Sequence, residues 1–465
     1  MRQQDVQGCQ EEVNLKMDFQ IIAAIIFLVV LTIFVYIKRK SMDTKQAVPH
    51  FLYFSMYKTK LGLKLMDSFA KKRRKLMVYI GYFGILAGFL GMGLICYSLI
   101  NNIFLLFTKP EAAPSVGVVL PFKGKGIFYV PFFYWIISIF VIAIVHEFSH
   151  GLIARANNLK IKSSGFAFVG VGFRLAGLAM IFISFYFNKI NFLNYSAPDF
   201  WIIAGIALVI LSFVKNISSI GFIPIIPAAF VEPDEKELKK RPRREQLSVF
   251  AAGPLANIIT AFLALAILSF IISPLANAAI EPNGVKVAEF AKGNITFPAE
   301  SAGISVEEII QQADNMPTPY RENLSQILHS KKPGDHVFLK TDKSFYQLRL
   351  VKNPDNESSA YMGAYLEQST KIKDNVIASY GEFLPNALIW IYGLFLILYI
   401  LNLGIGLFNL VPIGPLDGGR MLQVPLQKYF GEEKGNKILI YVSLFFLIII
   451  FVNLTAGFGL FKFFH

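Results

Sequence analysis

Long apolar stretches, separated by short polar ones, dominate the chain. About eight of them approach the length needed to cross the roughly 30 Å of hydrocarbon in a bilayer. They are residues 19–37, 77–107, 126–154, 166–187, 200–214, 247–279, 383–411 and 437–460. The pattern therefore predicts a polytopic α-helical membrane protein.

Basic residues predict how these segments are oriented. The first apolar segment has no small-residue cleavage site and runs directly into Lys38, Arg39 and Lys40, so we expect a retained signal anchor. The basic residues continue to Lys75, which places this loop in the cytoplasm by the positive-inside rule. Alternation then puts the basic loops 155–162 and 236–244 inside. It puts both termini and the hydrophilic stretch 280–375 outside.

Composition narrows the class of protein. Hydrophobic residues make up 54% of the chain, charged residues make up 16%, and the mean hydropathy is +0.52, which argues against a soluble enzyme. The net charge of +14 comes mainly from residues beside apolar segments, so we expect contact with anionic lipid and no nucleic-acid partner. Cys9 and Cys96 are too few for a cysteine-rich zinc site. Any metal must use histidine and carboxylate ligands.

The third apolar segment ends in a His-Glu-x-x-His motif. On a helix, His146 and His150 lie four residues apart on one face, where both imidazoles can bind one Zn²⁺. Glu147 is then placed to act as the general base that takes a proton from the attacking water. The alternative is that these residues only cap a helix. Ionisable groups are costly inside a membrane, which favours the zinc site.

A catalytic zinc ion normally has a third protein ligand. The seventh apolar segment runs into Asn409-Leu-Val-Pro-Ile-Gly-Pro-Leu-Asp417-Gly-Gly-Arg, where proline and glycine break the helix beside a carboxylate. The predicted orientation puts this end on the cytoplasmic side, as it does His146 and His150. Asp417 is therefore the candidate third ligand, and the alternative is an ordinary Asp-Gly turn.

Together with Gly253-Pro254-Leu-Ala-Asn257, these two motifs resemble the site-2 protease family of intramembrane zinc metalloproteases. The resemblance implies that His146, His150 and Asp417 bind zinc and that Glu147 is catalytic. It also implies that Asn409 lies near the site, where its amide could stabilise an oxyanion. An interhelical hydrogen bond is the alternative for Asn409. Gly253, Pro254 and Asn257 are candidates for substrate binding, or else form a structural kink.

The sequence departs from the family pattern after the catalytic helix. The family has a short extended segment there, whereas about 55 residues intervene here, and we leave the role of this insertion, 166–220, open. Either Gly165–Phe168 or the stretch from Gly221 to Phe230 could form the edge strand. We favour the latter, with Gly221 and Phe222 as candidate substrate contacts.

Residues 280–375 combine turn signals with alternating apolar positions, which predicts short strands. The stretch resembles the PDZ domains of prokaryotic relatives, and an unrelated α+β insertion is the alternative. We expect four regions: 1–125, with N-terminal segments and the basic loop; 126–279, the first part of the catalytic core; 280–375, an extracytoplasmic PDZ-like domain; and 376–465, the second part of the core.

The favoured function is an intramembrane zinc metalloprotease in the cell membrane of a prokaryote, with an archaeon as one candidate source and the active site towards the cytoplasm. Its partners would be single-span membrane proteins, and peptide ends would bind the PDZ-like domain. Three alternatives stay open: a membrane zinc or cation transporter, a zinc peptidase acting outside the bilayer, and a non-catalytic scaffold.

Overall fold

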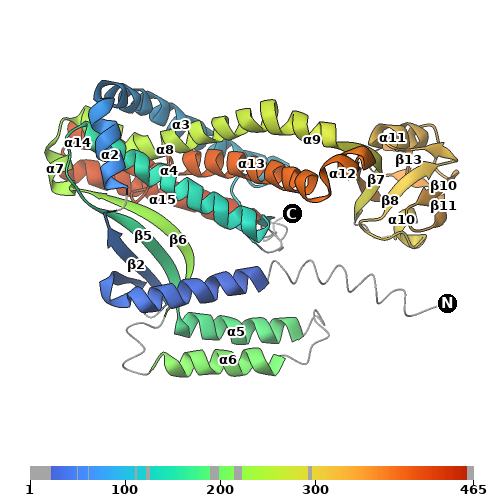
Figure 1. The fold of residues 1–465 in the computed structure, drawn as a ribbon, viewed down its shortest axis with the longest axis horizontal. Coiled ribbons are helices and arrows are strands. Elements are labelled where there is room, and N and C mark those ends of the chain that lie inside the picture. The colour runs from blue at the N-terminus through green and yellow to red at the C-terminus, as the bar shows by residue number, and fades with distance from the viewer. Residues whose placement is uncertain are drawn as a thin grey trace. The chain divides into compact units, whose positions relative to one another are not determined.

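The computed structural model describes residues 22–49, 51–60, 62–109, 113–121, 126–188, 198–213, 222–291, 296–354 and 356–457. The chain divides into two compact units (Figure 1). The first comprises Met1–Leu265 and Leu394–His465, and the second comprises Ala266–Gly393. Each unit has its own core and is described separately.

Within the described residues, six helices are long and apolar enough to cross a membrane, by length and composition. They correspond to six of the eight predicted segments. They are Ile22–Ser41, which ends in the 3-10 turn η1 (Arg39–Ser41); α3 (Arg74–Thr108); α4 (Phe132–Ala156); Arg243–Ala279, formed by α8 (Arg243–Ile267), the π-helical turn η2 (Leu268–Ile272) and α9 (Ser273–Ala279); α13 (Phe383–Phe408); and α15 (Glu432–Gly457).

The other two predicted segments, 166–187 and 200–214, differ from expectation. Residues Ile161–Gly172 form strand β5, and the apolar residues after it form α5 (Phe173–Asn188) and α6 (Pro198–Leu211). These helices have 16 and 14 residues, short of the roughly 20 that span a bilayer. The structure therefore does not confirm these two segments as spans; for 166–187, the reason is that a hydropathy window does not distinguish a buried strand from a helix. The two helices pack side by side, and a Cβ added at Gly177 would lie 2.5 Å from the Gly205 carbonyl oxygen.

A four-stranded antiparallel sheet adjoins the helices of the first unit. Its order is β1 (Met42–Val48), β2 (Leu52–Thr59), β5 and β6 (Phe222–Pro233), so β6 forms one edge (Figure 1). Over their described residues, both candidate stretches are therefore strands, and the favoured one lies at the edge. Strand β6 packs against α4, the helix that carries the His-Glu-x-x-His motif.

Glycines on one face of α3 let neighbouring helices approach closely. They recur every three or four residues, which places them along one side of the helix. A Cβ at Gly84 would lie 3.2 Å from Leu255, and one at Gly88 would lie 2.6 Å from Met421. Helix α3 thus contacts both α8 and α14 (Asp417–Phe430), the two elements that, with α4, surround the candidate site.

Shorter elements complete the first unit. Helix α2 (Leu63–Lys72) packs on α3 and α4, and α7 (Glu235–Lys240) follows β6. The parallel strands β3 (Val118–Leu120) and β4 (Ile127–Tyr129) precede α4. The Trp135 indole N–H donates to the Val119 carbonyl at 3.1 Å, which ties the start of α4 to this pair.

The second unit contains an α+β core, as expected for 280–375. Its sheet has the order β11 (Phe345–Arg349), β10 (His336–Thr341), β8 (Ile309–Ala313), β7 (Ile280–Phe290) and β14 (Ala364–Ile372), with β9 (Met316–Pro317) on β8. Strands β12 (Val351–Asn353) and β13 (Asn356–Tyr361) form a separate pair. Between Ile280 and Tyr380, the helices are α10 (Pro298–Ser301), α11 (Arg321–His329) and α12 (Asp374–Tyr380). Val285, Ile310 and Leu324 are fully buried in its core.

Candidate metal centre

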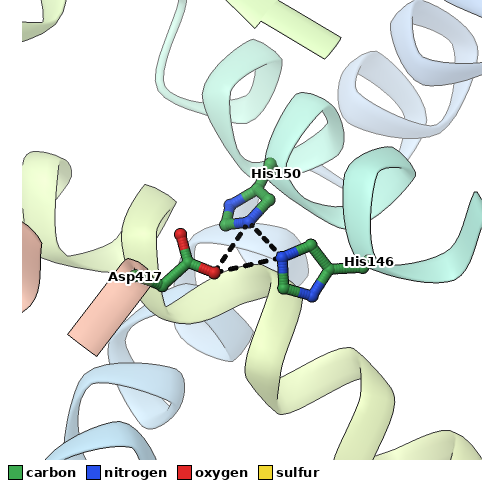
Figure 2. A group of neighbouring side chains, drawn as sticks. All are labelled: His146, His150 and Asp417. Atoms are coloured by element: carbon green, nitrogen blue, oxygen red, sulfur yellow. Dashed lines mark hydrogen bonds and ion pairs between the residues drawn. The ribbon is translucent and has the colours of Figure 1, made fainter. Parts of the chain in front are cut away.

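Two helices bring three metal-ligating side chains together. His146 and His150 lie one turn apart on α4, and Asp417 is the first residue of α14 (Figure 2). The two Nε2 atoms are 3.1 Å apart, and Asp417 Oδ2 lies 3.0 Å from His146 Nε2 and 3.4 Å from His150 Nε2. The structure thus unites the three predicted ligands across more than 260 residues of sequence.

This cluster fits zinc in donor type and spacing. Imidazole nitrogen and carboxylate oxygen are common zinc ligands, and two ligands bound to tetrahedral zinc are roughly 3.3 Å apart. The three separations in the cluster lie close to that value. A three-ligand set also leaves one tetrahedral position for water or substrate, as a catalytic site requires.

The loop before α14 explains how Asp417 reaches the histidines. Helix α13 ends at Phe408, and the chain folds back so that the Gly418 N–H donates to the Asn409 carbonyl at 2.8 Å. A Cβ at Gly418 would lie 2.1 Å from the Leu410 carbonyl oxygen, and one at Gly419 would lie 2.1 Å from that of Ile413. Only glycine fits so close to a carbonyl, so the Gly-Gly pair allows the loop to present Asp417.

Hydrogen bonds at Nδ1 orient both imidazoles. His150 Nδ1 lies 2.7 Å from the Val249 carbonyl oxygen, which can only accept, so Nδ1 carries the proton and Nε2 presents its lone pair. His146 Nδ1 lies 3.1 Å from the amide group of Asn257. The Asn257 Oδ1 atom is buried and otherwise without a partner among the described residues. An amide orientation that turns Oδ1 towards Nδ1–H satisfies both groups.

Helix α8 packs directly against the two imidazoles through the Gly253 motif. A Cβ at Gly253 would lie 2.4 Å from His150 Nε2 and 2.6 Å from His146 Cε1. Pro254 lies inside this helix, and Asn257 is fully buried one turn further along, on the face that Gly253 presents to the histidines. The motif therefore packs directly against the two candidate ligands, a contact that the sequence pattern alone left undecided.

Glu147 contacts the edge strand. Its Oε2 atom accepts a hydrogen bond from the Val231 N–H of β6 at 2.9 Å. Neither Val231 nor Val249 could be singled out from the sequence, because both act through backbone atoms that carry no residue signature. The sequence indicates only where they lie: Val231 is in the edge strand, and Val249 is one helical turn before Gly253.

One cavity of about 670 Å³ joins these groups. Its wall includes both imidazoles, Glu147, Asp417 and Asn409, whose side-chain amide forms no hydrogen bond with the described residues. Residues 230–233 of β6 form another part of the wall, and Lys162, Glu235, Lys236 and Arg420 add charge to it. The site therefore adjoins both a strand edge and a polar opening.

The remaining candidate residues lie elsewhere. Phe222 is 4% exposed and stacks on Tyr53, with ring centroids 5.2 Å apart, so it belongs to the core between the sheet and the first helix and not to the cavity wall. Gly221 lies outside the described residues.

A family model described as peptidase family M50 matches residues 193–450, which is more than half of the chain. The matched range includes α8, Asn409 and Asp417, and it begins after His150. His146 and His150 precede the matched range, but in the structure they lie beside Asp417, which is inside it.

Two proteins of the archaeon Methanocaldococcus jannaschii are similar in sequence. An uncharacterized protein is 23% identical over 368 residues, which are 78% of this chain and 75% of that protein. A zinc metalloprotease is 40% identical over 81 residues, which are 15% of this chain and 24% of that protein. The higher identity is thus confined to a short region, and this chain matches about a quarter of the zinc metalloprotease.

Among solved structures, the PDZ domain of the SdrC-like protein from Listeria monocytogenes is similar, with 21% sequence identity and a TM-score of 0.15. The similarity covers 18% of this chain and 87% of that domain.

Proposed function

The chain belongs to peptidase family M50, and from this premise we propose that it is an intramembrane zinc metalloprotease. It hydrolyses peptide bonds within or near the transmembrane helices of single-span membrane proteins. The observation that carries the proposal is the cluster of His146, His150 and Asp417, whose histidines lie on a helix long and apolar enough to cross a membrane. The family and the six candidate membrane spans together identify the chain as a membrane metalloprotease.

His146, His150 and Asp417 would hold the zinc ion, which supplies Lewis acidity that polarises a carbonyl and lowers the pKa of water. Glu147, held by the Val231 N–H, accepts the proton of the attacking water and returns it to the leaving amine. Asn409 lines the same cavity, and its side-chain amide forms no hydrogen bond with the described residues. It can therefore donate to the oxyanion of the tetrahedral intermediate. Loss of such a donor costs about 3 to 4 kcal/mol in other hydrolases.

The edge of β6 supports an extended mode of substrate binding. The backbone amides of a transmembrane helix are protected by their own hydrogen bonds, so a scissile carbonyl becomes accessible only after local unwinding. A strand edge beside the catalytic groups can replace the lost backbone bonds by strand addition. Residues 230–233 of β6 line the catalytic cavity, which puts this edge where an unwound segment would need support.

Residues 280–375 serve, in this proposal, as a PDZ-like domain outside the membrane. Their sheet and helix α11 provide the α+β core that such a domain requires. The domain would filter substrates by size or bind their trimmed ends. The positive-inside rule places the catalytic end of α4 towards the cytoplasm of a prokaryotic cell.

The test is incubation of the purified full chain with a single-span membrane protein, with and without a chelator, followed by mass determination of the products. We expect chelator-sensitive cuts inside the hydrophobic segment. Cuts confined to soluble regions would instead indicate a peptidase acting outside the bilayer.

A Glu147→Gln variant separates protease from transporter. It should retain zinc and lose cleavage, because the amide cannot accept the proton. The matched control is Glu433→Gln, which removes an exposed carboxylate paired only with Lys437 among the described residues. If Glu147→Gln cleaves as fast as the control, the proposed mechanism is wrong.

A further inference from the structure

A second cavity lies at the C-terminal end of α4, the helix that carries the His-Glu-x-x-His motif. It has a volume of about 360 Å³ and is separate from the zinc cluster. Its wall combines α2, the start of α3, the end of α4 and the turn that follows. The lining residues used below are Asp67, Lys71, Arg74, Arg155, Lys160 and Glu237.

The depth of this cavity follows from two candidate membrane spans. Arg74 is the first residue of α3, and Arg155 lies in the last turn of α4. The Arg74 Nε–H donates to the Ala156 carbonyl at 2.9 Å, so the two helix ends meet here. Because both helices are long and apolar enough to cross a bilayer, their common end would lie at headgroup level.

The charge of the cavity favours an anion. Four cationic side chains line it against two carboxylates, and each carboxylate already has a partner. Asp67 Oδ1 pairs with Arg155 Nε at 3.0 Å, and Glu237 Oε1 pairs with Arg241 Nη2 at 2.6 Å. Across the described part of the chain, Lys71, Arg74 and Lys160 form no ion pair, and both lysines are exposed. Their charges are therefore available to a ligand.

Helix α2 indicates that the anion is attached to lipid. Met66 and Ala70 are buried against the protein, whereas Leu65 and Phe69 are 58% and 53% exposed. These apolar side chains share a ten-residue helix with Lys64, Lys71 and Lys72. An amphipathic basic helix of this kind lies in the membrane interface, with its apolar residues towards the acyl chains.

We propose that this cavity binds the phosphate group of an anionic lipid headgroup. Lys71 and Lys160 are the ligands from α2 and from the turn after α4, and Arg74 supplies a third positive charge. The exposed Leu65 and Phe69 side chains face the acyl chains of the same leaflet. The bound headgroup thereby links α2 and α3 to α4, the helix that carries His146, Glu147 and His150.

The test measures binding and does not depend on cleavage. The purified full chain, in neutral detergent, is titrated with short-chain phosphatidylglycerol, with phosphatidylcholine of the same chain length, and with inorganic phosphate. Dissociation constants are measured by native mass spectrometry. The pocket variant is Lys71→Gln with Lys160→Gln, and the charge-matched control is Lys239→Gln with Lys434→Gln, both exposed lysines outside the cavity. Thermal unfolding of each variant checks that it is folded.

We expect the wild type and the control to bind phosphatidylglycerol at least about tenfold more tightly than the pocket variant, since each lysine near an anionic headgroup contributes substantially to binding. Phosphatidylcholine, which has no net charge, should not distinguish the variants. Equal loss in the control would show diffuse surface attraction and overturn the proposal. Inorganic phosphate binding as tightly as phosphatidylglycerol would also overturn it, because the occupant would then be a soluble anion.

Discussion

The Val231 N–H of the edge strand donates to Glu147 Oε2 at 2.9 Å. One backbone group thus connects the strand that we propose to hold the substrate with the side chain that we propose to move the proton. A change in the strand at this point should therefore alter catalysis without touching the metal ligands.

Val231→Pro tests this connection. Proline removes the N–H, so Glu147 loses a donor worth about 1.5 to 3 kcal/mol for a charged acceptor. We expect kcat to fall by roughly tenfold or more while zinc content stays at the wild-type level. Val231→Ala keeps the N–H and should retain most activity. Parallel loss of zinc and activity in Val231→Pro would show that the strand serves the fold and not the base.

Gly253→Ala tests the contact between α8 and the imidazoles. The added Cβ would lie 2.4 Å from His150 Nε2, so the helix or the rings must shift. We expect zinc occupancy, measured by metal analysis of the purified protein, to fall strongly. Gly404→Ala on α13 is the control, because no described atom lies within 4 Å of its Cβ. If both variants bind zinc equally, close packing of α8 on the histidines is not required for metal binding.

Asn257 should position His146 and not contact substrate, because it is fully buried behind that ring. Replacing the hydrogen-bond partner of a metal-bound histidine typically costs about 10- to 100-fold in metal affinity. We expect Asn257→Leu to show this loss and Asn257→Asp, which keeps an acceptor, to restore much of it. Asn402→Leu, at an equally buried asparagine, should leave zinc affinity unchanged. An effect on KM alone would instead support the substrate-binding role.

Asp417→Ala removes the candidate ligand that comes from the distant part of the chain. We expect loss of both bound zinc and cleavage, because two histidines do not complete a catalytic zinc set. Asp374→Ala, at a carboxylate whose side chain is 89% exposed, is the matched control. Wild-type zinc occupancy in Asp417→Ala would remove this residue from the site.

Parts of the site could be predicted because their signal is local. His146 and His150 are four residues apart on one helix, so their common face follows from helical geometry alone. Asn257 and Val249 could not be assigned in the same way. Their contacts with the imidazoles join residues about a hundred positions apart, and one of them uses only a backbone carbonyl.

Sequence by itself determined the membrane class, six candidate membrane spans and the candidate ligand types, because apolar length and residue chemistry are properties of the chain. Tertiary structure alone decided that 161–172 is a strand, that β6 is the sheet edge, and that Asp417 meets the two histidines. The physical reason is that hydropathy reports how apolar a segment is. It does not report which backbone groups pair, or which distant side chains share a few ångströms of space.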